Sequence, residues 1–257
     1  MFIAIVLAGE RSEKNVLLEY AKVNCKSLIK INGKPMLMHV LDALLQAKLF
    51  DDVFVIGPNK IVDECPEIKE LVVSKKIKFY EQKISPAESV LSVFDEIDEN
   101  KKIIITTSDN VLLKVEWLEY FCNEAVQSNK DVLMAVNDFK IVQSKYPESK
   151  RTVLKFKDIS FCFCNLFAIM DKEARHVVNI WRKVETLRKK PLKIAKMFMS
   201  FWGLILFSIG ALSSKDAFNI MSKKMSTRVG LVNMPFPEAC IDVDKVDDLI
   251  LVKKILS

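Results

Sequence analysis

Short apolar runs alternate with stretches of helical periodicity along the first half of the chain. The apolar runs, each closed by a glycine or a polar residue, predict strands over 2–7, 53–57, 78–80, 103–107 and 132–136. Apolar residues spaced three and four positions apart predict helices over 36–49, 87–97 and 117–128. Strands that alternate with helices indicate an α/β fold, with a mostly parallel sheet and helices on both faces.

The pattern changes after Asn137. Strands are predicted over 152–156 and 161–170, whereas 172–224 is largely helical and rich in bulky apolar residues. A strand pattern returns at 230–234, the alternating segment 241–244 follows, and a last amphipathic helix is predicted over 246–256. Since no linker or repeat divides the chain, we expect one domain over 1–257 with a helical insertion at about 172–228.

The segment Met197–Leu212 contains almost no polar residue and follows a basic stretch that begins at Arg188. It is shorter than the roughly 20 apolar residues that a membrane span needs, and two glycines interrupt it. We expect a buried pair of helices broken at a glycine. The alternative is peripheral contact with an anionic membrane surface through 188–212.

Composition places the chain among folded domains. Of 257 residues, 50% are hydrophobic and 28% are charged, which excludes intrinsic disorder. The net charge of +6 is compatible with phosphorylated small molecules, nucleic acid or a membrane surface. No nucleic-acid-binding module is recognisable, so we expect no nucleic-acid partner.

Six scattered cysteines include no C-x-x-C pair, which argues against a zinc site and favours reduced thiols in a cytoplasmic protein. The apolar start of the chain lacks the basic region of a secretory signal, so we interpret it as the first strand.

The first strand ends in a small-residue turn. Leu7, Ala8 and Gly9 are followed by Arg11, and Lys26 comes later. Backbone N–H groups exposed at the end of a buried strand, with basic side chains nearby, suit a polyphosphate.

Three aspartates are predicted to meet at the same edge of the sheet. Asp109 follows the predicted strand 103–107, and alternation along 241–244 places Asp242 and Asp244 on one side. Carboxylate oxygens, substrate phosphates and water are the ligands that Mg²⁺ prefers. We therefore predict a magnesium site; the alternative is that Asp109 and Asp244 cap the helices that follow them.

These motifs resemble the signature of the GT-A-type nucleotidyltransferases. The resemblance is carried by four segments: Val6–Arg11, Lys26–Leu37, Ser108–Leu113 and Ile241–Leu249. The middle block, within Tyr146–Phe167, resembles a bacterial MobA-like NTP transferase subfamily. The relatives include molybdenum-cofactor guanylyltransferase and the cytidylyltransferases of sugar acids and of methylerythritol phosphate. The resemblance covers nearly the whole chain and implies a Rossmann-like sheet of the GT-A type.

The family resemblance implies an Mg²⁺-dependent reaction in which a small phosphorylated or hydroxylated acceptor attacks the α-phosphate of an NTP and pyrophosphate leaves. CTP and GTP are the NTPs that it favours. It implies that Arg11 and Lys26 neutralise the triphosphate and that Asp109, Asp242 and Asp244 hold the metal. The nucleotide site would comprise Leu7, Ala8, Gly9, Arg11, Lys26, Ser89 and Asp109. Arg151 and Asn165 lie where the family binds its acceptor, and Ser89 has a second interpretation as a helix cap.

Some positions depart from the family pattern. Glu10 stands where a second glycine is usual, Val111 replaces a proline, and Phe163-Cys164 replace a Gly-Gly pair. These changes support an alternative function, a catalytically degenerate relative that binds a nucleotide or a partner, with a peripheral location at the inner face of the membrane.

Overall fold

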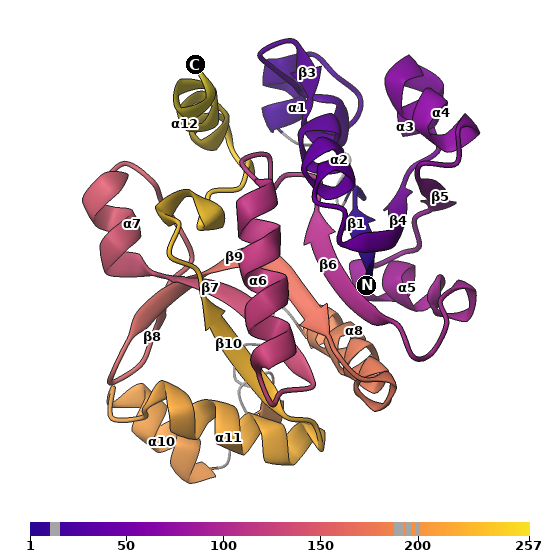
Figure 1. Cartoon of the computed structure of the whole chain (residues 1–257). Coiled ribbons are helices and arrows are strands. Elements are labelled where there is room, and N and C mark those ends of the chain that lie inside the picture. The colour runs from indigo at the N-terminus through magenta and orange to yellow at the C-terminus, as the bar shows by residue number, and fades with distance from the viewer. Residues whose placement is uncertain (11–15, 188–192, 194–196, 199–200) are drawn as a thin grey trace.

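The computed structural model of the chain describes residues 1–10, 16–187, 193, 197–198 and 201–257. One eight-stranded sheet runs through it (Figure 1). The strands follow one another across the sheet as β10 (Val229–Asn233), β7 (Val132–Asp138), β9 (Ser160–Ile169), β6 (Lys102–Thr107), β1 (Phe2–Leu7), β4 (Phe50–Gly57) and β5 (Lys78–Glu81), and β8 (Leu154–Lys155) pairs with β9.

The sheet is mostly parallel, as predicted. Strand β9 runs antiparallel to β6, β7 and β8, whereas β10–β7, β6–β1, β1–β4 and β4–β5 are parallel pairs. A separate two-stranded ribbon joins β2 (Lys30–Ile31) to β3 (Lys34–Pro35). The parallel strands end at one edge of the sheet, where open α/β folds bind their ligands.

Helices cover both faces of the sheet. They are α1 (Val16–Ala21), α2 (Met36–Gln46), α3 (Lys60–Glu64), α4 (Pro66–Val73), α5 (Pro86–Leu91), α6 (Val115–Gln127), α7 (Phe139–Lys145), α8 (Val177–Leu187), α10 (Phe201–Ser208), α11 (Ser214–Met225) and α12 (Val246–Leu256). Short 3₁₀ turns are η1 (Lys26–Leu28), η2 (Phe94–Glu96), η3 (Lys172–His176) and η4 (Pro237–Cys240).

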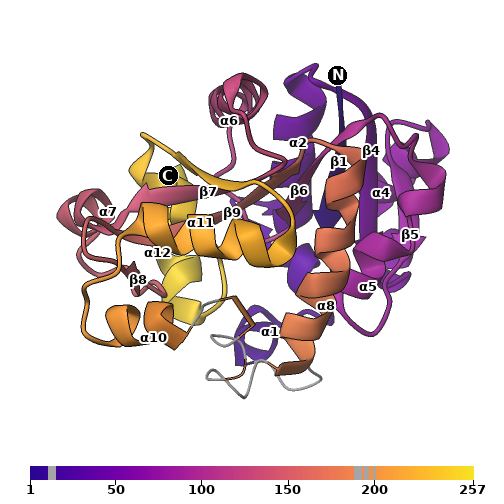
Figure 2. The same ribbon diagram turned by 90° about the horizontal axis from the view of Figure 1, so that it is seen from below.

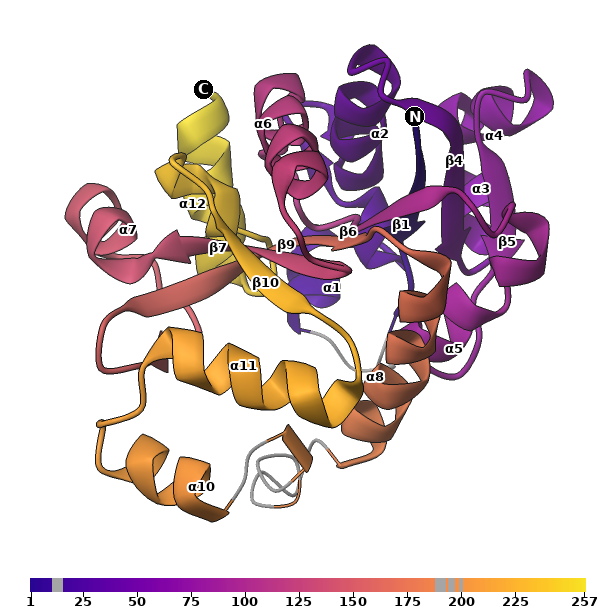
Figure 3. The same ribbon diagram turned by 60° about the horizontal axis from the view of Figure 1, so that its bottom comes forward.

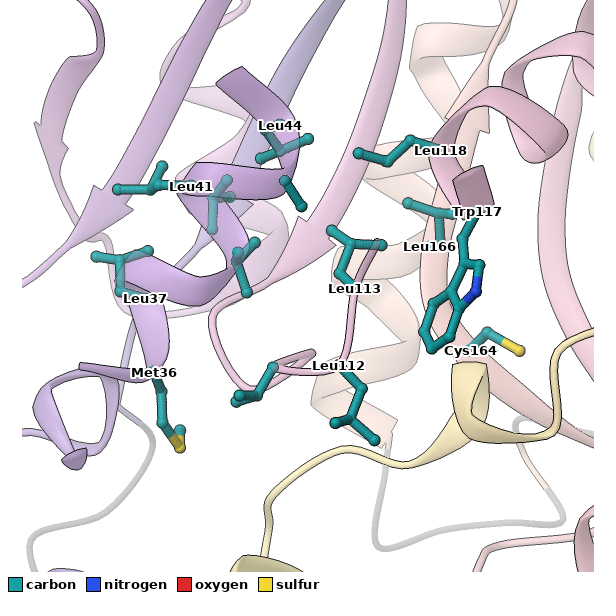
Figure 4. Close-up of a cluster of buried hydrophobic side chains, with 14 of the residues drawn as sticks. Met36, Leu37, Leu41, Leu44, Leu112, Leu113, Trp117, Leu118, Cys164 and Leu166 are labelled. Atoms are coloured by element: carbon teal, nitrogen blue, oxygen red, sulfur yellow. The ribbon is translucent and has the colours of Figure 1, made fainter. Parts of the chain in front are cut away.

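Alternation along β1 creates two hydrophobic cores. Phe2, Ala4 and Val6 join the larger core with α2, α6 and α12, while Ile3 and Ile5 join the second core with α5, α8 and α11. Both faces of the central strand are therefore buried, which explains why its sequence is a continuous apolar run. Figure 4 shows part of the larger core, where leucines of α2 lie close to the segment that follows β6.

Several predicted elements have different bounds or are absent. The helix predicted over 87–97 ends at Leu91, and the strand predicted over 152–156 is reduced to β8. The alternating segment 241–244 pairs with no strand of the sheet. The short helices α1, α3, α4 and α7 were not predicted, because each is too short to show a full helical repeat.

The helices α8, α10 and α11 lie together on one side of the sheet (Figures 2 and 3). Among the described residues of 172–224, most belong to η3, α8, α10 and α11, as the sequence pattern predicted. Helix α10 ends before Gly210, whose φ of +68° is the left-handed conformation that glycine favours, and α11 follows. Leu206 and Phe207 of α10 are exposed, and so is Ile209 after it, whereas Leu212 is buried; this partial burial corrects the expectation of a buried pair of helices. Arg188 lies outside the described residues.

Within the described part of the chain, every helix is too short or too polar to cross a membrane. The six cysteines are all buried, and each is a free thiol. None of them contributes to a metal-binding cluster among the described residues.

Candidate active site

The loops that follow β1 and β6 meet because these strands are neighbours, with Leu7 opposite Thr107. Ser108 donates its backbone N–H to the Leu7 carbonyl at 3.0 Å. Ser27, in η1, donates its hydroxyl to the Ala8 carbonyl at 3.0 Å and lies 2.8 Å from the Ser108 hydroxyl. These buried hydrogen bonds fix η1 between the two loops and place Lys26 at the carboxyl edge of the sheet.

The segment 241–244 joins the same edge through the backbone. Val243 donates its N–H to the Asp109 carbonyl at 3.1 Å. Ile241 and Val243 are fully buried, so Asp242 and Asp244 project to the opposite side. The prediction that these two aspartates share one side agrees with the structure, although an extended segment rather than a strand holds them.

Three carboxylates and one ammonium form the centre of the site. One oxygen from each of Asp109, Asp242 and Asp244 lies within 4.8 Å of the others. The Lys26 ammonium donates to Asp109 and to Asp244, each at 2.6 Å. Burial alone would lower the pKa of Lys26, but the two carboxylates outweigh it and raise that pKa above its usual value. Lys26 therefore stays charged at neutral pH.

Two side chains hold the Asp242 carboxylate in place. It accepts hydrogen bonds from the Arg151 guanidinium and, at 2.7 Å, from the Asn165 amide. Burial, and then the charges of Asp109 and Asp244, raise the pKa of Asp242 to about 6, although Arg151 and Asn165 oppose the shift. The part of this shift that comes from Asp109 and Asp244 is one that a bound cation would oppose, since a positive charge favours the ionised carboxylate.

Arg151 and Asn165, predicted to bind the acceptor, thus both contact a predicted metal ligand. Arg151 also pairs with Asp248, which accepts the backbone N–H groups of Asp244 and Lys245 at 3.1 and 2.9 Å. Asp248 therefore links the start of α12 to the site. Asp248 was not among the predicted site residues. Its place three residues after the N-cap Lys245 is nevertheless a sequence signal for a side chain that accepts backbone N–H groups at a helix start.

Glu10, which replaces a glycine in the phosphate turn, does not point freely into the site. Its carboxylate accepts the Lys26 backbone N–H at 2.9 Å and the Lys60 ammonium at 2.8 Å. Its own N–H donates to the Gln82 side chain at 2.9 Å. The charge of Glu10 is therefore paired, and Gln82 occupies the position where an anion oxygen would accept that N–H.

Other predicted residues also lie around the site. Ser89 is buried in α5, and its hydroxyl accepts the Lys83 N–H of the loop after β5 at 2.9 Å. Its interpretation as a helix cap is wrong, because Ser85 caps α5. Phe163 faces the cavity at this edge, whereas Cys164 belongs to the larger core, so only one of the two replaced glycines affects ligand access. Arg11 lies outside the described residues.

Neither Asp109 nor Asp244 caps a helix: the helices after them begin with Lys114 and Lys245 as N-caps. The three carboxylates suit a divalent cation, since Mg²⁺ takes oxygen ligands at about 2.1 Å and opposite ligands are then about 4.2 Å apart. The three oxygens lie within 4.8 Å of one another, and the Lys26 ammonium contacts two of the three aspartates, Asp109 and Asp244. The donor set is therefore one that could hold a divalent cation.

A cavity of about 1020 Å³ opens at this edge of the sheet. Leu7, Gly9, Lys26 and the three aspartates line one end of it. Ala8, also predicted to bind the nucleotide, is fully buried beneath the turn.

The open α/β sheet, with carboxylates and a lysine at its carboxyl edge, defines a domain of the nucleotide-handling class. A model of the MobA-like NTP transferase domain matches residues 4–185. The chain therefore belongs to this family, and with it to the nucleotidyltransferases.

Solved structures share the fold. A hypothetical transferase from Thermus thermophilus has a TM-score of 0.79 and 24% identity, with 96% of this chain and 99% of that chain covered. The 4-diphosphocytidyl-2C-methyl-D-erythritol synthase of Anaerococcus prevotii has a TM-score of 0.58 and 14% identity, with 99% and 96% covered. A CMP:2-keto-3-deoxy-manno-octonic acid synthetase complexed with CTP has a TM-score of 0.56 and 13% identity, with 99% and 97% covered.

Proposed function

We propose that this protein is an Mg²⁺-dependent nucleotidyltransferase that transfers an NMP from an NTP to a small phosphorylated or hydroxylated acceptor. The observation that carries the proposal is the convergence of Asp109, Asp242 and Asp244 around Lys26 at the carboxyl edge of the sheet. Family membership supports the same reaction class.

In this reaction an oxygen of the acceptor forms a bond to the α-phosphorus as the bond to the α–β bridging oxygen breaks. Pyrophosphate leaves with that electron pair, and a hydroxylated acceptor also releases one proton to water. A divalent cation bound by the three aspartates would supply charge neutralisation at the α-phosphate.

The chain's own residues have distinct roles in the proposal. Asp109, Asp242 and Asp244 hold the cation, and the Lys26 ammonium neutralises phosphate oxygens. Arg151 and Asn165 orient the Asp242 carboxylate, because both donate to it. Arg151 and Asn165 also remain our candidates for contact with the acceptor. Arg11 is proposed to bind the triphosphate together with the turn Leu7–Gly9.

CTP or GTP is the proposed nucleotide, with the loop around Ser89 beside the base or ribose. CTP is the first choice to test, because the CMP:2-keto-3-deoxy-manno-octonic acid synthetase that shares this fold is complexed with CTP.

The test is pyrophosphate release from each of the four NTPs, with Mg²⁺ and a panel of phosphorylated and hydroxylated acceptors. We expect one NTP to be preferred and Asp109→Asn to abolish its turnover. Asp247→Asn is the matched control, because Asp247 is an exposed aspartate in the first turn of α12, three residues from Asp244. Turnover that survives Asp109→Asn would remove the basis of the metal site.

A degenerate, nucleotide-binding relative is the second candidate. The observation in its favour is that Gln82 already accepts the Glu10 N–H, so the phosphate turn has one donor fewer than a free turn would offer. Binding of an NTP without pyrophosphate release from any of the acceptors would support it.

A further inference from the structure

The cavity at the active site extends far beyond the charged cluster and becomes apolar. Its lining begins at the three aspartates and continues along one face of the sheet to α8, α10 and α11. Figures 2 and 3 show these three helices together on that face. At about 1020 Å³ it lies at the upper limit of ordinary small-molecule pockets, which measure roughly 300–1,000 Å³.

The two ends of the cavity differ in chemistry. Among the described lining residues, the charged ones belong to the carboxyl edge of the sheet: Glu10, Lys26, Lys83, Asp109, Asp242 and Asp244. The helices and strands of the inner end contribute apolar side chains, among them Met134, Phe167, Trp181, Phe207, Phe218 and Met221. Methionine side chains adapt their shape to an apolar ligand more readily than branched ones do.

Ordinary core packing does not account for this space. Protein interiors are close-packed, and voids much larger than a water molecule are few. A polar ligand does not suit the inner end either, because its hydroxyl or amide groups would lose water without gaining partners there. A hydrocarbon chain has no polar group that would lose its water there.

The wall also comes from a particular part of the chain. The match to the family ends at residue 185, whereas α10 and α11 lie beyond it. The helices α10 and α11, outside the family match, add Phe207, Ala217, Phe218 and Met221 to an apolar end that α8 and the sheet also line. The charged end comes from both parts of the chain, because Asp242 and Asp244 also lie beyond residue 185.

We infer that the acceptor is amphipathic: a phosphate or hydroxyl head at the aspartate cluster, joined to a hydrocarbon chain that occupies the apolar end of the cavity. This inference rests on the proposed function for the role of the head group. The chain need not be recognised by any specific polar contact, so its length and volume determine affinity.

The test compares n-decyl phosphate with ethyl phosphate, which have the same head group and different chains. Isothermal titration below the micelle concentration should show binding of n-decyl phosphate at least about tenfold tighter, with a negative heat-capacity change from apolar burial. Equal affinity of the two compounds would overturn the inference, and this comparison needs no variant.

Ala217→Phe fills the apolar end from α11 without removing any polar group. It should weaken binding of n-decyl phosphate about tenfold or more and leave binding of ethyl phosphate unchanged. The matched control is Asn219→Phe, which adds the same side chain on the exposed side of the same helix. Equal loss of affinity in both variants would contradict the assignment of the chain to this cavity.

The pyrophosphate assay separates this inference from the proposed function. Turnover that is as fast with ethyl phosphate as with n-decyl phosphate would overturn the amphipathic acceptor and leave nucleotidyl transfer standing. Tight, chain-dependent binding of n-decyl phosphate without turnover of any NTP would support the cavity assignment and count against the transferase.

Discussion

At the scale of single residues, the lysine between the carboxylates determines how the site behaves. The Lys26 ammonium forms ion pairs with two aspartates, and only 17% of its side chain is exposed. Such a charge is positioned before any substrate arrives, which is the condition under which electrostatic stabilisation of a transition state is strong.

We predict that Lys26→Met lowers turnover by about 100-fold or more, because a preorganised donor to a developing charge is worth roughly that factor. The measurement is kcat for pyrophosphate release with the preferred NTP. Lys30→Met, a substitution of an exposed lysine four residues away, is the control and should leave kcat unchanged. Equal kcat values for the two variants would show that Lys26 pairs with the aspartates only in the absence of ligands and does not act in turnover.

Arg151 supports a second prediction, this time on stability. Its side chain is 7% exposed and pairs with two carboxylates, Asp242 and Asp248. Arg151→Ala should lower the free energy of unfolding by about 3–5 kcal/mol, because it leaves buried carboxylates without their cation. Urea unfolding measures the effect.

Arg228→Ala is the matched control for Arg151. Arg228 pairs with Asp131, but 58% of its side chain is exposed, and exposed ion pairs contribute about 0–1 kcal/mol. If Arg151→Ala lowered the free energy of unfolding by no more than Arg228→Ala does, water would have to reach the carboxylates of Asp242 and Asp248.

Sequence motifs predicted the residues at the centre of the site better than those around it. Asp109, Asp242, Asp244 and Lys26 stand in motifs with a recognisable order, and the structure brings them together. The pairing of Glu10 with Lys60 could not be predicted, because 50 positions separate the two residues and neither belongs to a shared motif. Such long-range pairing depends on the packing of loops rather than on local pattern.

At the scale of elements, hydrophobic pattern predicted the interior strands and the longer helices. The continuous apolar run of β1 is buried on both faces, so its signal is strong. The segment 241–244 has the alternation of a strand, yet it pairs with no strand of the sheet, and Val243 donates its N–H to the Asp109 carbonyl instead. Alternation reports which side of a segment is buried, and it does not report whether a neighbouring strand is present to pair with.

Gly57, the last residue of β4, lies close to the turn after β1. A Cβ added at Gly57 would lie 3.1 Å from the Ala8 carbonyl oxygen and 2.7 Å from the Ile61 side chain. Gly57→Ala should therefore lower the free energy of unfolding by about 1–3 kcal/mol through overpacking. Thermal or urea unfolding measures the loss.

Gly230→Ala, in β10, is the control for Gly57. Its added Cβ would meet only the side chain of Lys130, which can move away. The two variants should differ clearly in stability. Similar stability would show that the phosphate turn shifts to accommodate a methyl group beside Ala8.

At the scale of the whole molecule, the antiparallel strand β9 places the second half of the chain against the first. It lies between β6 and β7, and it contributes Asn165 to the charged end of the cavity and Phe167 to the apolar end. The sequence predicted the strands of this half but not their order in the sheet, because order depends on contacts between distant segments.

Ligand binding should stabilise the whole molecule if the proposed function holds. The preferred NTP with Mg²⁺, at about 100 times its Kd, should add roughly 2.7 kcal/mol to the free energy of unfolding, and EDTA should remove most of that gain. A thermal-shift titration with each NTP, with and without the metal, checks this. The same shift in EDTA would mean that the nucleotide binds independently of the aspartates.

The contact between Lys26 and the aspartates has a consequence for the order of events. A divalent ion would bind the carboxylates of Asp109 and Asp244 that the Lys26 ammonium now contacts, so the two cations compete, and the ammonium needs another anion when the ion binds. A triphosphate provides that anion. Metal and nucleotide should therefore bind with positive cooperativity, each raising the affinity for the other by the same factor.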